Sequence, residues 1–204
     1  MKYEEFLGRR LSTFKKTFEI CQEILETRGE LNIVELGTTR SFREDIFTTD
    51  IEYYSPQPEV WDWGAGSFTK VFADNLPQAT IYSVDPLPEA VFVAKTICKD
   101  NRNVMIYEST AEFFLKSMPK PNKIDLLYMD HLESGEEACE THLKDVKYAI
   151  ENDLLSKESL ILHDDVNTPD GESKSIYSIP YLKKQGYREI MADYQSLMYR
   201  NINI

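Results

Sequence analysis

Apolar residues near the N-terminus recur at steps of three and four, which places them on one face of a helix that Arg28 and Gly29 would end. They are Leu7, Leu11, Phe14, Phe18, Cys21 and Leu25. The run at 32–37 is short, contains β-branched residues and closes with glycine, as a buried parallel strand does. The pattern therefore predicts an N-terminal helix within residues 1–30, followed by the first strand.

The rest of the chain repeats this alternation. Helices are predicted at 67–76, 89–99, 111–117, 136–150 and 179–185, and strands at 80–85, 104–107, 124–130, 159–163, 186–191 and 196–200. Strands that alternate with helices form a parallel sheet with helices on both faces, and the last two strands read as an antiparallel hairpin. We expect one α/β domain over 1–204, with a doubly wound, Rossmann-like, mostly parallel seven-stranded sheet.

The segment 39–66 does not fit the alternation. It puts roughly two dozen residues between the first strand and its helix, where such loops usually have about two to six. Its aromatic residues are Phe42, Phe47, Tyr53, Tyr54, Trp61 and Trp63, too many for a disordered linker. We interpret the segment as a folded lid or substrate wall. The rings can equally serve to pack the insertion onto the domain, and both readings can hold together.

Composition narrows the classes of partner. The chain has 204 residues, of which 42% are hydrophobic, and a net charge of -12 that disfavours nucleic acid as a substrate. The sequence lacks a signal peptide and an apolar run that could span a membrane, so we expect a cytoplasmic protein. The three cysteines are far apart, which favours buried thiols over disulfides or a zinc site. The N-terminal helix can cover its own sheet or form the seam of a homodimer, and we favour the first.

Candidate binding residues lie where predicted strands end, because ligands of open α/β sheets bind there. Gly37 allows a sharp turn after the first strand, and Glu35 can accept hydrogen bonds from an amino group. Gly66 and Ser67 restore a split glycine motif if the insertion loops outward; the alternative is an ordinary helix entry. Asp85 ends the second strand, where an acid commonly receives ribose hydroxyls; the alternative is a turn aspartate before Pro86.

Three further acids follow the fourth and fifth predicted strands. Asp130, Asp164 and Asp165 should converge at neighbouring strand ends, and such oxygen ligands suit Mg²⁺ or Ca²⁺. Alternatively, Asp164 caps a turn and Asp165 faces solvent.

Two histidines flank this predicted cluster. His131 is our candidate catalytic base, because an imidazole beside a cation could take the proton of an acceptor hydroxyl. His163 could do the same, but strand alternation can point it into the sheet. A hydrogen-bonded structural role remains an equal alternative for each histidine.

These motifs together resemble class I S-adenosylmethionine-dependent methyltransferases, especially small-molecule O-methyltransferases, over nearly the whole chain. The resemblance rests on Val34-Glu35-Leu36-Gly37-Thr38, Ser67-Phe68-Thr69, Val84-Asp85 and Ile124-Asp125-Leu126-Leu127-Tyr128-Met129-Asp130. It implies that Glu35, Gly37 and Thr38 contact the methionine part of the cofactor, Asp85 the ribose and Thr110 the adenine. Gly66, Ser67 and Asp130 complete the expected cofactor residues.

The resemblance also bears on the metal and on the reaction. In catechol O-methyltransferase and the macrolide sugar O-methyltransferases, acids matching Asp130, Asp164 and Asp165 hold Mg²⁺. This chain departs from the family by its split glycine motif and by Ser109-Thr110-Ala111, where many relatives carry an acid before alanine. We expect a magnesium-assisted O-methyltransferase acting on a small hydroxylated metabolite, such as a sugar or natural-product intermediate. The alternatives are an NAD-dependent oxidoreductase and a non-catalytic binding module with the same fold.

Overall fold

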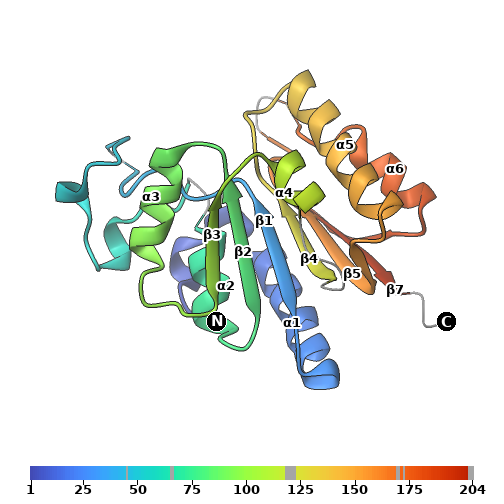
Figure 1. The fold of residues 1–204 in the computed structure, drawn as a ribbon, viewed down its shortest axis with the longest axis horizontal. Helices are drawn as coiled ribbons and strands as arrows, with labels where there is room; N and C mark the ends of the chain where they lie inside the picture. Colours follow the sequence, from blue (N-terminus) through green and yellow to red (C-terminus); the bar gives the residue numbers. More distant parts are fainter. Residues whose placement is uncertain (45, 65–66, 118–122, 169–170, 172, 202–204) are drawn as a thin grey trace.

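A seven-stranded sheet in the order β3-β2-β1-β4-β5-β7-β6 forms the centre of the molecule (Figure 1). The computed structural model describes residues 1–201 except 45, 65–66, 118–122, 169–170 and 172. The strands are β1 (Asn32–Leu36), β2 (Thr80–Asp85), β3 (Val104–Glu108), β4 (Ile124–Met129), β5 (Leu155–His163), β6 (Arg188–Ala192) and β7 (Ser196–Asn201). β1 to β5 pair in parallel, and β7 is antiparallel to both β5 and β6. The predicted fold class is confirmed.

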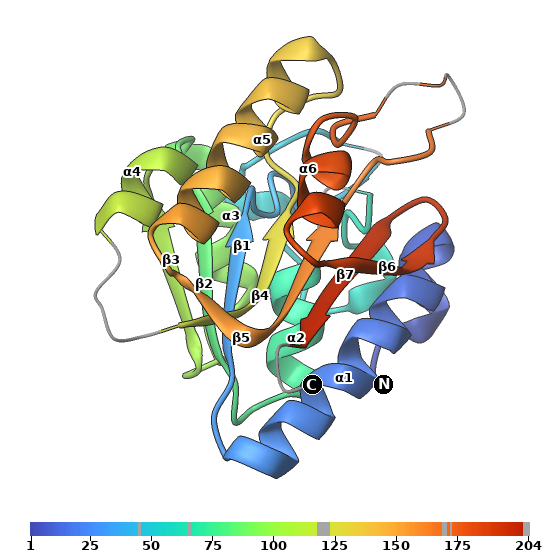
Figure 2. The ribbon, with the colours of Figure 1, turned by 90° about the vertical axis from the view of Figure 1, so that its right-hand side faces the viewer.

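Helices cover both faces of this sheet (Figure 2). They are α1 (Leu11–Arg28), α2 (Phe68–Asn75), α3 (Pro88–Ile97), α4 (Ala111–Ser117), α5 (Glu136–Glu151) and α6 (Ser178–Lys184), with 3-10 turns η1 (Glu4–Phe6), η2 (Gly8–Arg10), η3 (Ile51–Tyr53) and η4 (Pro58–Val60). One apolar core joins α1 and α2 to one face of the sheet, and a second joins α4, α5 and α6 to the other. Alternation along β4 supplies both cores, since Leu126 faces the first and Leu127 the second.

The first helix covers its own sheet. Gly29 ends α1 in a left-handed conformation with φ 73°, as glycine after a helix does. The buried face is rotated from the expected stripe, because Thr13 and Thr17 are buried while Leu11 and Phe18 are only partly buried. The Thr17 hydroxyl donates to the Thr13 carbonyl over 2.8 Å, so a buried polar group is satisfied within the helix. Sequence periodicity missed these threonines because they are not apolar.

The insertion packs against α3 and β3. Phe42 and Trp61 form a buried cluster with Val93, Ile97 and Cys98, and Trp61 donates its indole N–H to the Ser55 carbonyl over 2.7 Å. Figure 1 shows this cyan segment beside α3, away from α5 and α6. The buried rings therefore pack the insertion onto the domain, which was one of the two interpretations. Its role as a lid or substrate wall stays a prediction.

Two smaller observations complete the fold. β5 begins at Leu155, four residues before the predicted strand, and its pairing with β4 shifts register between Ile124 and Leu126. The polar residues at 156–158 hid this early start. No helix in the described part of the chain is both long and apolar enough to cross a bilayer.

Candidate active site at the carboxyl ends of the strands

The turn after β1 brings two strand ends into contact. Gly37 has φ +89°, and a β-carbon there would lie 2.8 Å from the backbone of Asp130 and His131. Its N–H donates to the Val84 carbonyl over 2.8 Å. Gly37 is therefore required for the close approach of the β1 and β4 ends, a reason that the sequence reading did not include.

Glu35 is wholly buried beneath this turn. One carboxylate oxygen, Oε2, accepts hydrogen bonds from the hydroxyls of Thr69 and Ser83, while Oε1 has no hydrogen-bond partner among the described residues. Burial raises the pKa of Glu35 to about 8, although the two hydroxyls oppose the shift. Buried polar atoms nearly always have a hydrogen-bond partner, so this unpartnered oxygen is a candidate acceptor for a ligand or an ordered water.

Thr38 and Asp85 are joined at the ends of β1 and β2. The Thr38 N–H donates to Asp85 Oδ2 over 3.1 Å, and the Leu87 N–H donates to Asp85 Oδ1 over 2.8 Å. Burial raises the pKa of Asp85, and these backbone donors act against it. Each carboxylate oxygen keeps a second lone pair, because an ionised carboxylate has about four acceptor sites.

The other predicted cofactor residues take local roles. The Ser67 hydroxyl donates to the Asp62 carbonyl over 3.2 Å and so ties the start of α2 to the insertion. Thr110 is exposed, and its hydroxyl accepts from the Phe113 N–H over 3.2 Å at the start of α4. Gly66 lies outside the described residues.

The three predicted acids do converge. One carboxylate oxygen from each of Asp130, Asp164 and Asp165 lies within 4.8 Å of the others. Asp164 is completely buried, which excludes the reading in which it only caps a surface turn. Burial and the neighbouring Asp164 raise the pKa of Asp130 to about 7.

Two cations from distant parts of the chain pair with these acids. Arg10, at the end of η2, places Nη2 2.6 Å and Nε 3.1 Å from the two oxygens of Asp164. The amide of Gln195 donates to Asp164 Oδ1 over 2.7 Å, so both oxygens of Asp164 are occupied. Arg10 also lies over the Tyr194 ring, with its guanidinium carbon 5.2 Å from the ring centroid.

Lys174 lies between the other two acids. Its Nζ is 2.9 Å from Asp165 Oδ2 and 3.1 Å from Asp130 Oδ1, and the residue is 4% exposed. Burial alone would raise the pKa of Asp165, but the Lys174 ammonium lowers it overall, and Tyr194 adds a hydrogen bond. Sequence reasoning missed Lys174 and Arg10, because nothing in a linear pattern links either residue to a strand end.

This arrangement does not fit Mg²⁺ as it stands. Mg²⁺ demands oxygen ligands at about 2.0–2.1 Å in near-octahedral geometry. The ammonium of Lys174 already bridges Asp130 and Asp165, and the oxygens of Asp164 accept hydrogen bonds from Arg10 and Gln195. A metal ion would have to displace these partners.

The histidines point to the face covered by α5 and α6. His131 Nε2 is 2.9 Å from Asp145 Oδ2 on α5, which is ion-pair distance, but both ring nitrogens are buried and neither has a hydrogen-bond partner among the described residues. His142, on α5, is buried, with Nε2 2.9 Å from the His131 carbonyl. His163 is buried against the Ser178 hydroxyl at 2.9 Å, so alternation does point it into the sheet packing. Burial lowers its pKa to about 3.

Comparison with known proteins was made by sequence and by structure. No family model matches the chain, and no curated protein matches it by sequence. A methyltransferase from Geobacter sulfurreducens superposes with a TM-score of 0.55 at 13% identity, over 91% of this chain and 78% of that one. An O-methyltransferase from Bacillus cereus in complex with SAH gives 0.56 at 13% identity, over 90% and 80%.

The chain has the class I methyltransferase fold. Monomeric WbdD aligns with a TM-score of 0.57 at 14% identity, over 93% of this chain and 41% of that one. At such identities the class I methyltransferase fold is what is shared, and residue roles must be argued from this chain alone.

Proposed function

We propose that this chain is an S-adenosylmethionine-dependent enzyme that transfers a methyl group to an oxygen of a small hydroxylated metabolite, such as a sugar or natural-product intermediate. The observation that carries the proposal is the placing of two acids, Glu35 and Asp85, at adjacent ends of β1 and β2 in a sheet of methyltransferase order. The O-methyltransferase among the structural neighbours supports an oxygen acceptor.

The cofactor would supply an electrophilic methyl group on a sulfonium. In our proposal, Glu35 Oε1 accepts from its amino group, directly or through water, and the free lone pairs of Asp85 accept from the ribose hydroxyls. Thr38 and Gly37 would line the methionine part, Thr110 would meet the adenine, and Asp130 would border the bound cofactor. Ser67, just before α2, would also contact the cofactor, and Gly66 remains a proposed cofactor residue from the sequence alone.

His131 is the proposed base. Asp145 Oδ2 lies 2.9 Å from Nε2 and would steady the imidazole, while Nδ1, which is buried and has no hydrogen-bond partner among the described residues, would take the proton of the acceptor hydroxyl. For this the acceptor must reach Nδ1 from the end of β4. Magnesium assistance is not part of the proposal, because Arg10 and Lys174 hold the acids that would bind the ion.

Two alternatives make different demands. An NAD-dependent oxidoreductase would also use Asp85, but it calls for a glycine-rich helix entry beneath a pyrophosphate. A non-catalytic module would bind the cofactor in the same place without transferring the methyl group.

The Asp85→Ala variant tests the proposed cofactor site. Calorimetry should show S-adenosylmethionine binding at least about ten-fold weaker than in the wild type, because charge-assisted hydrogen bonds to the ribose are lost. Asp100→Ala, an exposed acid just before β3 at the opposite edge of the sheet, is the matched control and should bind normally. Equal affinity in folded Asp85→Ala and Asp100→Ala proteins would remove Asp85 from the site.

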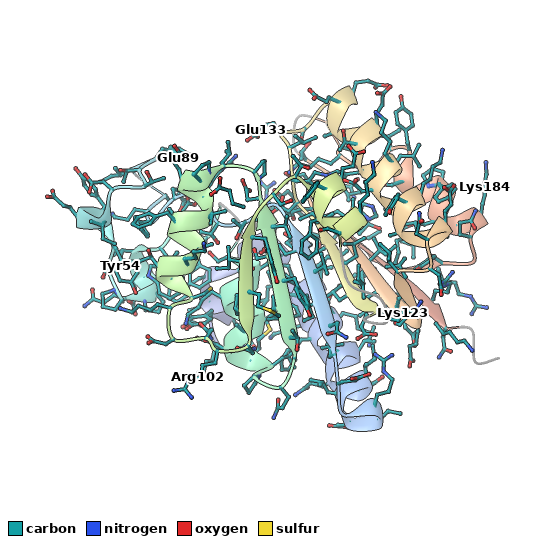
Figure 3. All side chains as sticks on the ribbon, in the orientation of Figure 1. Tyr54, Glu89, Arg102, Lys123, Glu133 and Lys184 are labelled. Carbon is teal, nitrogen blue, oxygen red and sulfur yellow. The ribbon has the colours of Figure 1, made fainter. Side chains whose placement is uncertain are left out.

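The two ends of the strands can be followed in Figure 3. It labels Glu89 and Glu133 near the carboxyl ends of the strands and Arg102 near the opposite, amino ends.

A further inference from the structure

The positive charge that balances the three acids comes from side chains of the chain itself. Asp130, Asp164 and Asp165 bring three carboxylates together, and such groups repel unless protons, cations or hydrogen bonds intervene. Arg10 and Lys174 bring two positive charges to them. The two cations divide the acids, since Arg10 pairs with Asp164 while Lys174 is shared by Asp130 and Asp165.

Lys174 takes the bridging position. Its Nζ contacts Asp130 Oδ1 at 3.1 Å, Asp165 Oδ2 at 2.9 Å and, more weakly, the Asp130 carbonyl at 3.4 Å. All three contacts are to oxygens of the kind that bind a hard cation. An ammonium buried to this degree is held only when it is paired, because taking an isolated charge out of water is very costly.

We propose that the Lys174 ammonium occupies the place of a divalent cation at the ends of β4 and β5, so that the native chain has no divalent metal site there and loss of Lys174 creates one. These residues lie near the end of β4, where the proposed function places the methyl acceptor. The inference itself does not depend on methyl transfer.

The three acids taken alone, without Lys174, would predict a metal site in the native protein. If Asp130, Asp164 and Asp165 hold a metal in the native protein, Asp165→Asn must weaken metal binding. If Lys174 fills the site, wild-type protein and Asp165→Asn should bind Mn²⁺ equally poorly, since neither has a vacant bridging position. This comparison needs no lysine variant and therefore decides the question even if Lys174 variants fail to fold.

Removing the ammonium should expose the site. We expect Lys174→Met to bind Mn²⁺ at least about ten-fold more tightly than wild type in an electron paramagnetic resonance titration, because the two partly buried carboxylates of Asp130 and Asp165 lose their counter-charge. Adding Asp165→Asn to Lys174→Met should abolish the gain. Mg²⁺ should also raise the melting temperature of Lys174→Met and leave that of the wild type unchanged.

Lys183→Met is the matched control, because Lys183 is an exposed lysine paired with one acid, Glu189, at 2.7 Å. It should gain no Mn²⁺ binding. Wild-type Mn²⁺ binding that Asp165→Asn weakens would overturn the inference, as would a folded Lys174→Met protein with wild-type affinity. Binding of S-adenosylmethionine, measured on the same samples, reports separately on the proposed function: the cofactor can bind whichever way the metal result falls, and its failure to bind leaves the metal result intact.

Discussion

At the level of single residues, the sequence predicts the acids of the candidate site but not the cations that pair with them. The acids at strand ends could be predicted because each directly follows or ends an apolar run, and the structure brings Asp130, Asp164 and Asp165 together. Their cations could not, because Arg10 lies 154 residues in sequence from Asp164, and Lys174 lies 44 residues from Asp130 and nine from Asp165, in segments without periodicity. Electrostatic partners depend on the tertiary fold, which a local pattern does not contain.

Glu35 makes stability depend on pH. Its pKa in the folded protein is about 8 against an ordinary value of 4.5, so the folded state binds more protons between these values. Stability should therefore fall as the pH rises from about 4.5 to about 8, by about 1.4 kcal/mol for each unit of difference between the two pKa values. Chemical denaturation across this range measures it.

Glu35→Gln removes the ionisable group and should flatten that part of the profile relative to the wild type. Glu26→Gln, at an exposed position on α1, should keep the wild-type profile. Parallel profiles for Glu35→Gln and wild type would contradict the raised pKa of the buried Glu35 carboxyl.

Gly37 offers a second residue-level prediction. Gly37→Ala should cost about 3 kcal/mol of stability, because the left-handed backbone and a contact at 2.8 Å with the Asp130 backbone both oppose a β-carbon. Gly29→Ala has a similar φ of +73° but open space around the β-carbon, so it should cost about 1 kcal/mol. Equal losses in thermal or urea unfolding would show that the strand-end contact is not tight.

At the scale of elements, the sequence predicted nearly every helix and strand, since hydrophobic period and turn residues agreed along the chain. β2 and α4 match their predicted bounds, and the other elements shift by a few residues. The function of the insertion could not be read in the same way, because aromatic rings suit both a core and a binding surface. In the structure, Phe42 and Trp61 are core residues, whereas Phe47 is 79% exposed.

Trp61→Ala should therefore destabilise the protein by about 3 kcal/mol, as the loss of a large buried side chain does. Phe47→Ala should change stability by less than about 0.5 kcal/mol. Urea unfolding of the two variants measures both values. A Trp61→Ala protein as stable as the wild type would mean that the insertion is not anchored to α3.

At the scale of the whole molecule, the antiparallel β7 between β5 and β6 distinguishes this sheet from a plain nucleotide-binding fold. The sequence predicted this ending as a hairpin, because two short strands follow the last helix after five alternating units. It could not give the acceptor, since acceptor recognition depends on loops whose side chains follow no period. The net charge of -12 agrees with a small metabolite better than with a polyanion.

The central claim is that the strand ends bind S-adenosylmethionine, and calorimetric titration of the purified wild-type chain tests it most directly. S-adenosylmethionine and its demethylated product should each bind once per chain, and NAD should give no saturable heat at the same concentrations. Saturable binding of NAD with no response to S-adenosylmethionine would contradict the account.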